Sequence, residues 1–151
     1  MKSSRRYKVL TGYEAEILTA AIPDVLGKAG TLPPVDEQEL VEWVDGHFLA
    51  KSAFEFRLLY HLLILALQFL FPLLFGSEYK IFLSLSSEEK QRLFEKWSQS
   101  RSYLLRNTFT LFRLVICFAY YGRDEVARAV GYDAGAKLEE ALKRQVVRDQ
   151  T

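Results

Sequence analysis

The sequence predicts an all-α protein, a single-domain helical bundle of about five to six helices over residues 1–151. Its apolar residues recur at the three- and four-residue spacing of amphipathic helices, and no segment keeps the strict alternation of a half-buried strand. Helix-capping residues stand directly before several of these segments. The chain has 151 residues, 50% of them hydrophobic, which is enough to bury a substantial core.

The first helix is marked by a capping box. Thr11 and Glu14 have the Ser/Thr-x-x-Glu spacing in which each side chain accepts a hydrogen bond from the other's backbone. Residues 1–9 precede this cap and are expected to be a flexible N-terminus. The helix is expected to end at Gly27 or Gly30, since glycine favours the left-handed conformation that closes many helices.

A second helix is expected after the rigid Pro33-Pro34 linker. Asp36 stands at its N-cap position, and apolar residues follow at helical spacing. The acidic residues in this segment are interpreted as a solvated helix face. These residues are Glu37, Glu39, Glu42 and Asp45.

The stretch from Leu58 to Phe75 has two interpretations. Its 18 residues carry no formal charge, at the lower limit of the about 17–25 residues that span a bilayer. It is also interrupted by His61, Gln68 and Pro72. His61 and Gln68 share one helix face and would both need polar partners in lipid. A buried or partner-covered helix is therefore favoured over a transmembrane span.

One long helix is expected to begin at the capping box of Ser86 and Glu89 and to end at Gly122. On a helical wheel its apolar arc covers more than half of the circumference, wider than the ~100° stripe of a surface helix. This helix is therefore expected to be central. Arg106 and Arg113 lie two turns apart on its narrow polar stripe. They either face solvent or pair with carboxylates or carbonyls of this chain or a partner.

The last part of the sequence is expected to add one short helix from Asp124 to Val130, closed by Gly131. A charged C-terminal tail over residues 134–151 follows it. This tail is only weakly amphipathic, and it is expected to be either helical or frayed.

No catalytic or metal-binding pattern stands out in the sequence. His47 and His61 are its only histidines, and neither H-E-x-x-H nor C-x-x-C occurs. The glycines within residues 27–30 lack the length and strand context of a phosphate-binding loop. Cys117 lies among apolar residues and is expected to be an inert buried thiol. With a net charge of +1 and no basic cluster, the sequence gives no indication of nucleic-acid binding.

A cytoplasmic location is expected. The single cysteine, Cys117, excludes a disulfide within this sequence and fits a reducing compartment. Arg5 and Arg6 form a twin arginine, but the apolar region that an export signal requires does not follow it. Glu14 and a helix start come next instead.

An ordered set of residues between Leu83 and Asp133 points to a family. It runs from "LSSEEKQRLFEKW" through Ser100-Arg101, Arg106, Phe109 and "FAYY" to Gly131-Tyr132. This pattern resembles the helical segment that precedes the flavin-binding domain of long-chain fatty alcohol oxidases, which are glucose-methanol-choline oxidoreductases. It is also similar to subunit 3, the small subunit, of gluconate 2-dehydrogenase complexes.

The resemblance implies a separately encoded, non-catalytic accessory subunit that stabilises a large flavoprotein subunit and covers its substrate entrance. The sequence ends soon after Gly131, where the oxidases continue into their dinucleotide-binding fold. FAD is therefore expected on the partner, with no cofactor, metal or catalytic residue on this chain, and a hydrophobic alcohol at the interface. The residues expected to bind the partner are Trp97, Arg101, Arg106, Phe109, Arg113, Tyr120, Tyr121 and Tyr132.

Two other functions remain open from the sequence. One is a stand-alone helical protein that binds an apolar ligand between the segments Leu58–Phe75 and Leu104–Phe118. The other is a peripheral membrane protein that uses the Phe-rich segment, which would add membrane association to the cytoplasmic location.

Overall fold

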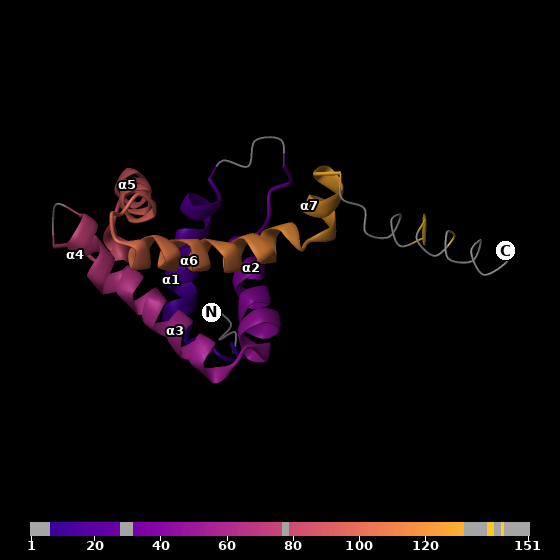
Figure 1. Ribbon diagram of the computed structural model, residues 1–151, viewed down its shortest axis with the longest axis horizontal. Helices are drawn as coiled ribbons and strands as arrows, with labels where there is room; N and C mark the ends of the chain where they lie inside the picture. Colours follow the sequence, from indigo (N-terminus) through magenta and orange to yellow (C-terminus); the bar gives the residue numbers. More distant parts are fainter. Residues whose placement is uncertain (1–6, 28–31, 77–78, 132–138, 141–142, 144–151) are drawn as a thin grey trace, which may run out of the picture.

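The computed structural model describes residues 7–27, 32–76, 79–131, 139–140 and 143 (Figure 1). This part of the chain is helical and contains no strand, which confirms the all-α prediction. The α-helices are α1 (Gly12–Leu26), α2 (Glu37–Trp43), α3 (Phe54–Leu65), α4 (Phe71–Phe75), α5 (Ser87–Ser98), α6 (Tyr103–Tyr121) and α7 (Asp124–Ala129). Two π-helical turns, Val44–Phe48 and Ala66–Leu70, extend α2 and join α3 to α4, and 3₁₀ turns lie at Leu49–Lys51 and Phe82–Ser84.

The predicted helix caps are confirmed. The Thr11 hydroxyl accepts from the Glu14 backbone N–H at 3.2 Å, and the Glu14 carboxylate accepts from the Thr11 N–H at 2.8 Å. Ser86 and Glu89 form the same reciprocal pair, at 3.3 and 2.8 Å. Gly27 follows α1 with a φ of 70°, in the left-handed region that its missing Cβ makes accessible. Short-range capping chemistry therefore sets these helix ends.

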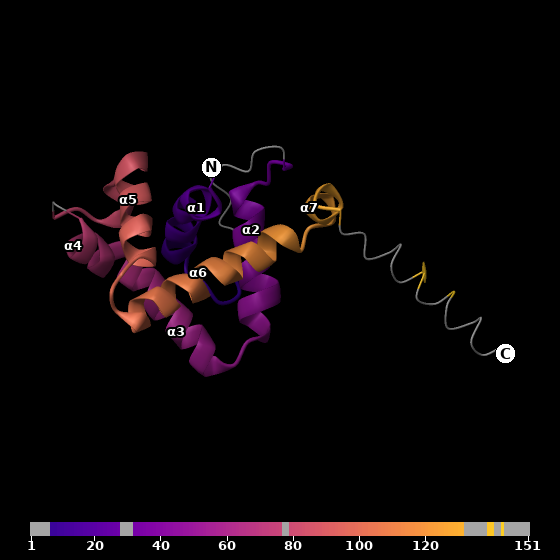
Figure 2. The same ribbon diagram turned by 45° about the horizontal axis from the view of Figure 1, so that its top comes forward.

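The centre of the bundle is α1 rather than the long helix expected there. Helix α1 packs against α2, α3, α5 and α6, and Ile17, Leu18 and Ala21 on it are fully buried. Figure 2 shows α1 lying between α5 and α2, with α6 starting below the end of α5 and running across the other two. The apolar arc of α6 is covered on one side only, since Leu104 remains 70% exposed and Phe118 55% exposed.

The single long helix expected from Ser86 to Gly122 is in fact two helices, α5 and α6. The break between them lies at residues 99–102, where Ser102 caps α6 by accepting from the Leu105 N–H at 3.4 Å. Trp97, fully buried, donates from Nε1 to the Leu105 carbonyl at 2.9 Å. The serines of this segment compete with helical hydrogen bonds, so the chain turns here although the apolar period continues.

The expectation that Asp45 belongs to a solvated helix face is wrong. Its side chain is 3% exposed and accepts three backbone hydrogen bonds from the segment before α1. The donors are the N–H groups of Lys8 at 2.6 Å and of Val9 and Leu10 at 2.8 Å each. A carboxylate buried in this way is stabilised by the converging N–H dipoles. Asp45 therefore holds the N-terminal segment against the turn that follows α2.

The C-terminal predictions are partly testable. Helix α7 ends one residue before the expected Val130, and Gly131 follows with a φ of 79°. Of the charged tail expected over residues 134–151, only residues 139–140 and 143 fall within the described part of the chain. Residues 1–6 of the N-terminus expected to be flexible also lie outside it.

Candidate functional site

Four of the eight predicted partner-binding residues line one groove. Two adjoining hollows form it, one of about 590 Å³ lined by Tyr120 and Tyr121, and one of about 280 Å³ lined by Phe109 and Arg113. The two hollows adjoin, since residues at the end of α1 and on α5 line both of them. The shared residues are Asp24, Leu26, Gly27 and Gln91. We refer to this feature as the α1–α5–α6 groove.

The smaller hollow has an apolar floor and a charged rim. Val25 and Phe94 are buried beneath it, and Phe109 packs half-buried against them. Asp24, Glu95 and Arg113 are among the charged residues that line it. Burial raises the pKa of Asp24, although Lys90 and Gln91 act in the opposite direction. An apolar floor with a mixed polar rim is the composition of a protein-binding or ligand-binding groove.

The two tyrosines of the larger hollow have different roles. Tyr120 is 5% exposed and its hydroxyl donates to the Pro33 carbonyl at 3.1 Å, which ties α6 to the proline linker. Burial raises the pKa of Tyr120, and the neighbouring Tyr121 adds to the effect. Tyr121 packs edge-on against the Tyr120 ring and is 49% exposed. Tyr120 therefore shapes the groove, whereas Tyr121 is accessible to a partner.

The other predicted partner residues lie away from the groove or outside the described structure. Trp97 is fully buried, so it stabilises the junction of α5 and α6 rather than meeting a partner. Arg101 is exposed in the turn between these helices. Arg106 is also exposed, and its Nη1 donates to the Ser100 carbonyl at 2.7 Å and the Arg101 carbonyl at 3.1 Å. It thus pairs with carbonyls of its own chain. Tyr132 lies outside the described residues.

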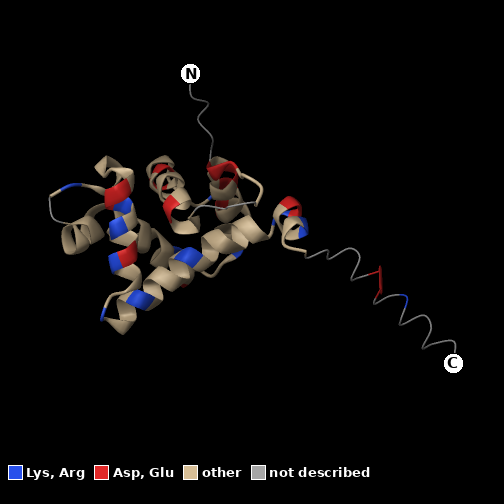
Figure 3. Ribbon diagram, turned by 90° about the horizontal axis from the view of Figure 1, so that it is seen from above, with Lys and Arg blue, Asp and Glu red and all other residues tan. Residues whose placement is uncertain are grey.

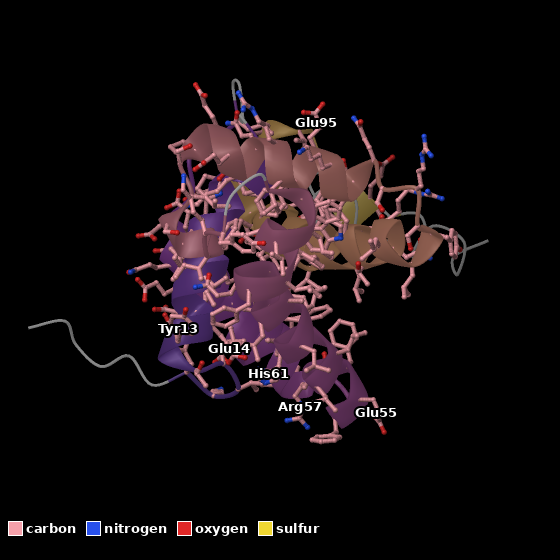
Figure 4. The ribbon with its side chains drawn as sticks, turned by 90° about the vertical axis from the view of Figure 1, so that its left-hand side faces the viewer. Tyr13, Glu14, Glu55, Arg57, His61 and Glu95 are labelled. Carbon is pink, nitrogen blue, oxygen red and sulfur yellow. The ribbon has the colours of Figure 1, made fainter. Side chains whose placement is uncertain are left out.

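The helix from Phe54 to Phe75 turns its polar residues inward, toward α1. Nδ1 of His61 donates to a Glu14 carboxylate oxygen at 2.6 Å (Figure 4). Gln68, fully buried, donates from Nε2 to the Tyr13 hydroxyl at 2.5 Å and accepts from the Leu83 N–H at 3.2 Å. His61 and Gln68 therefore share one face of the helix, as predicted. Both side chains find their hydrogen-bond partners within this chain.

The Glu14 carboxylate is held in its charged form by this contact. Burial alone would raise the pKa of Glu14, but the hydrogen bonds from Thr11 and His61 together lower it below its ordinary value. The carboxylate lies between α1 and α3 with its side chain 6% exposed. The Glu14–His61 pair is therefore a polar contact between α1 and α3, within an otherwise apolar packing surface.

The outward side of the same helix is apolar and uncovered. Within the described part of the chain, Phe54–Phe75 is the one helix long and apolar enough to cross a membrane, and 39% of its most apolar window is buried. We call its exposed side the leucine face. It consists of Phe54, Leu58, Leu59, Leu62, Leu65, Phe69, Leu70, Leu73 and Leu74, which are 39–67% exposed.

The described residues contain no cluster of three histidine, cysteine, aspartate or glutamate side chains that could hold a metal ion. Cys117 is half-buried on α6, less enclosed than expected. Sequence reasoning did not identify Asp24 or Gln91 as groove residues, because their only signal is their position on α1 and α5. Comparison with protein-family models, with curated proteins and with solved structures gave no match for this chain.

Proposed function

We propose that this chain is a non-catalytic accessory subunit that binds a larger FAD-containing oxidoreductase of the glucose-methanol-choline type. The observation that supports this proposal is the convergence of Phe109, Arg113 and Tyr121 on the α1–α5–α6 groove. The family resemblance includes Phe109 and Tyr121, and Arg113 lies one turn after Phe109 on the same side of α6.

The groove has the composition of a protein-binding surface. Tyrosine and arginine are enriched among the residues that carry binding energy at interfaces, and Tyr121 and Arg113 are both exposed. The apolar floor at Phe109 suits an aromatic or aliphatic anchor of the partner. A partner carboxylate beside Arg113 would form a charge-assisted hydrogen bond. In such a complex the partner's flavin supplies the chemistry and this chain supplies a surface beside the substrate entrance, where a hydrophobic alcohol would pass.

The proposal is tested by isolating the tagged chain from cells that express it naturally. We expect a co-purifying large chain with flavin absorbance, whereas the chain produced alone should show no flavin absorbance and no alcohol oxidation with artificial electron acceptors. Arg113→Glu should lose the flavoprotein without losing helicity, since this side chain is exposed. Arg92→Glu on α5, whose side chain is 74% exposed away from the groove, is the matched control.

Two results would contradict the proposal. Stoichiometric flavin on the chain produced alone would place the cofactor here rather than on a partner. An isolated monomer that carries lipid and never a flavoprotein would instead support the stand-alone apolar-ligand protein.

A further inference from the structure

The lining of the α1–α5–α6 groove carries unbalanced negative charge. The charged residues that line its two hollows are Asp24, Glu37, Glu95 and Arg113. Three carboxylates therefore face one guanidinium among the described residues of the lining. Helices α1 and α2, which supply or border Asp24 and Glu37, contain no lysine or arginine, and Figure 3 shows red positions on both. The groove as a whole thus favours a cation over an anion.

This negative charge is concentrated in the larger hollow. Asp24 and Glu37 both line it, and none of its described lining residues is a lysine, an arginine or a histidine. Glu95 and Arg113 line only the smaller hollow. The two ends of the groove therefore differ in charge. The end beside α2 is acidic, whereas the end beside Phe109 holds the one basic residue of the described lining.

Two basic residues near the larger hollow are engaged elsewhere. Lys90 acts on Asp24, but its ammonium group lies over the Phe82 ring, 5.1 Å from the centroid, and it does not line the hollow. Arg123 pairs with Glu39 at 2.7 Å. Burial raises the pKa of Asp24 although Lys90 acts in the opposite direction. A raised pKa is expected for a carboxylate whose charge the chain compensates only in part.

The walls of the larger hollow suit a long basic side chain. Ile22, Leu26 and Val35 give it apolar surface, and the Tyr121 ring on its border is 49% exposed. Lysine and arginine bury their aliphatic stems on apolar surface and keep the charged end among polar groups. An aromatic face attracts the same cation. The volume of about 590 Å³ lies within the roughly 300–1,000 Å³ of ligand sites, so it has room for such a side chain and its neighbours.

We infer that the flavoprotein partner inserts a basic side chain, carried on an apolar segment, into the larger hollow toward Asp24 and Glu37. The inference rests on the proposed function and adds the chemistry of the segment that fills the groove. The two carboxylates would accept charge-assisted hydrogen bonds from this side chain. Arg113, at the other end, would pair with an acidic residue of the same segment. The segment would then bind in one direction only, because reversal would place like charges together.

The test compares the parent chain with the double variant Asp24→Asn/Glu37→Gln, in which both side chains keep their shape and lose their charge. The flavoprotein that co-purifies with the tagged chain is the probe, and its affinity for each chain is measured at low and at high salt. We expect the double variant to bind about tenfold more weakly at low salt, through the loss of two partly exposed ion pairs. Its affinity should also depend less steeply on salt than that of the parent chain.

A matched variant and a fold check accompany this comparison. Glu16→Gln/Glu125→Gln removes the same charge from exposed positions on α1 and α7 that line neither hollow, and it should bind the flavoprotein normally. The helicity of Asp24→Asn/Glu37→Gln should equal that of the parent chain, because burial already disfavours the Asp24 charge. Glu37→Gln alone should weaken binding about threefold.

Four outcomes would overturn the inference. If the double variant binds as tightly as the parent chain while Arg113→Glu loses the flavoprotein, the groove holds the partner without a basic side chain, and the proposed function stands. A loss of affinity with an unchanged salt dependence would mean that shape rather than charge was lost. A dimer of the parent chain in sedimentation velocity, absent from the double variant, would place a second copy in the groove. If no flavoprotein co-purifies, the proposed function fails and this inference fails with it.

Discussion

Replacing Asp45 tests how the N-terminal segment is held to the bundle. One carboxylate oxygen accepts from the Lys8 N–H and the other from the Val9 and Leu10 N–H groups. Asparagine keeps one acceptor oxygen and turns an NH₂ group toward a remaining donor. Asp45→Asn therefore loses at least one hydrogen bond to a charged group, which contributes about 1.5–3 kcal/mol.

Alanine at this position should cost more. All three hydrogen bonds are lost, but the N–H groups of Lys8 and Val9 are partly accessible and can bind water. Leu10 is 5% exposed, so its N–H would remain buried without an acceptor, at a further penalty of about 1–3 kcal/mol. We expect a total loss of about 3–5 kcal/mol, a large share of the roughly 5–15 kcal/mol that stabilises a typical domain.

Urea unfolding followed by far-UV circular dichroism measures both losses. The midpoint should fall while the denaturant slope stays constant, since the same surface is exposed on unfolding. Glu125→Gln on α7 is a control at an exposed site and should stay within about 0.5 kcal/mol of the parent chain. If Asp45→Ala costs less than about 1 kcal/mol, water replaces the carboxylate and the proposed anchoring role is wrong.

The remaining predictions concern three other side chains. Because the pKa of Glu14 is lowered in the folded chain, its contribution is present above its ordinary pKa of 4.5 and is lost as pH falls through the folded value. Glu14→Gln should therefore flatten the acid side of a plot of unfolding free energy against pH, and an unchanged plot would contradict the reasoning. Arg106→Leu should cost up to about 1 kcal/mol in the isolated chain through loss of its two carbonyl contacts. A normal urea midpoint combined with lost partner binding would assign this arginine to the interface instead. Ser86→Ala should cost about 1 kcal/mol as a lost N-cap, and Ser87→Ala, one residue into α5, should not.

The parts of the fold that follow from local chemistry could be predicted from the sequence. The caps at Thr11 and Ser86 depend on residues three positions away, and both were located correctly. The break between α5 and α6 carried a signal as well, because Ser102 is a good N-cap residue. The apolar residues keep their helical spacing across residues 99–102, and this spacing favoured one continuous helix over a new start at Ser102.

The contacts that join distant segments could not be predicted in the same way. Asp45 meets its three donors 35–37 residues away, and nothing near it in sequence marks it as buried. For His61 and Gln68 the shared helix face was predictable, but the choice of Glu14 and Tyr13 as partners was not. Likewise, the groove joins Phe109 and Arg113 to α1 through packing that no motif records.

The hydrogen bonds that His61 and Gln68 form with residues of α1 also set the rotation of the helix Phe54–Phe75 about its own axis. Leucines lie on every side of the helix Phe54–Phe75. Burial of apolar surface alone would therefore hardly favour one side over another as the side that faces the core. Turning it by one residue, about 100°, would move Gln68 away from the Tyr13 hydroxyl and leave the Leu83 N–H without its acceptor. The contacts of His61 and Gln68 therefore determine which leucines of this helix are exposed on the surface.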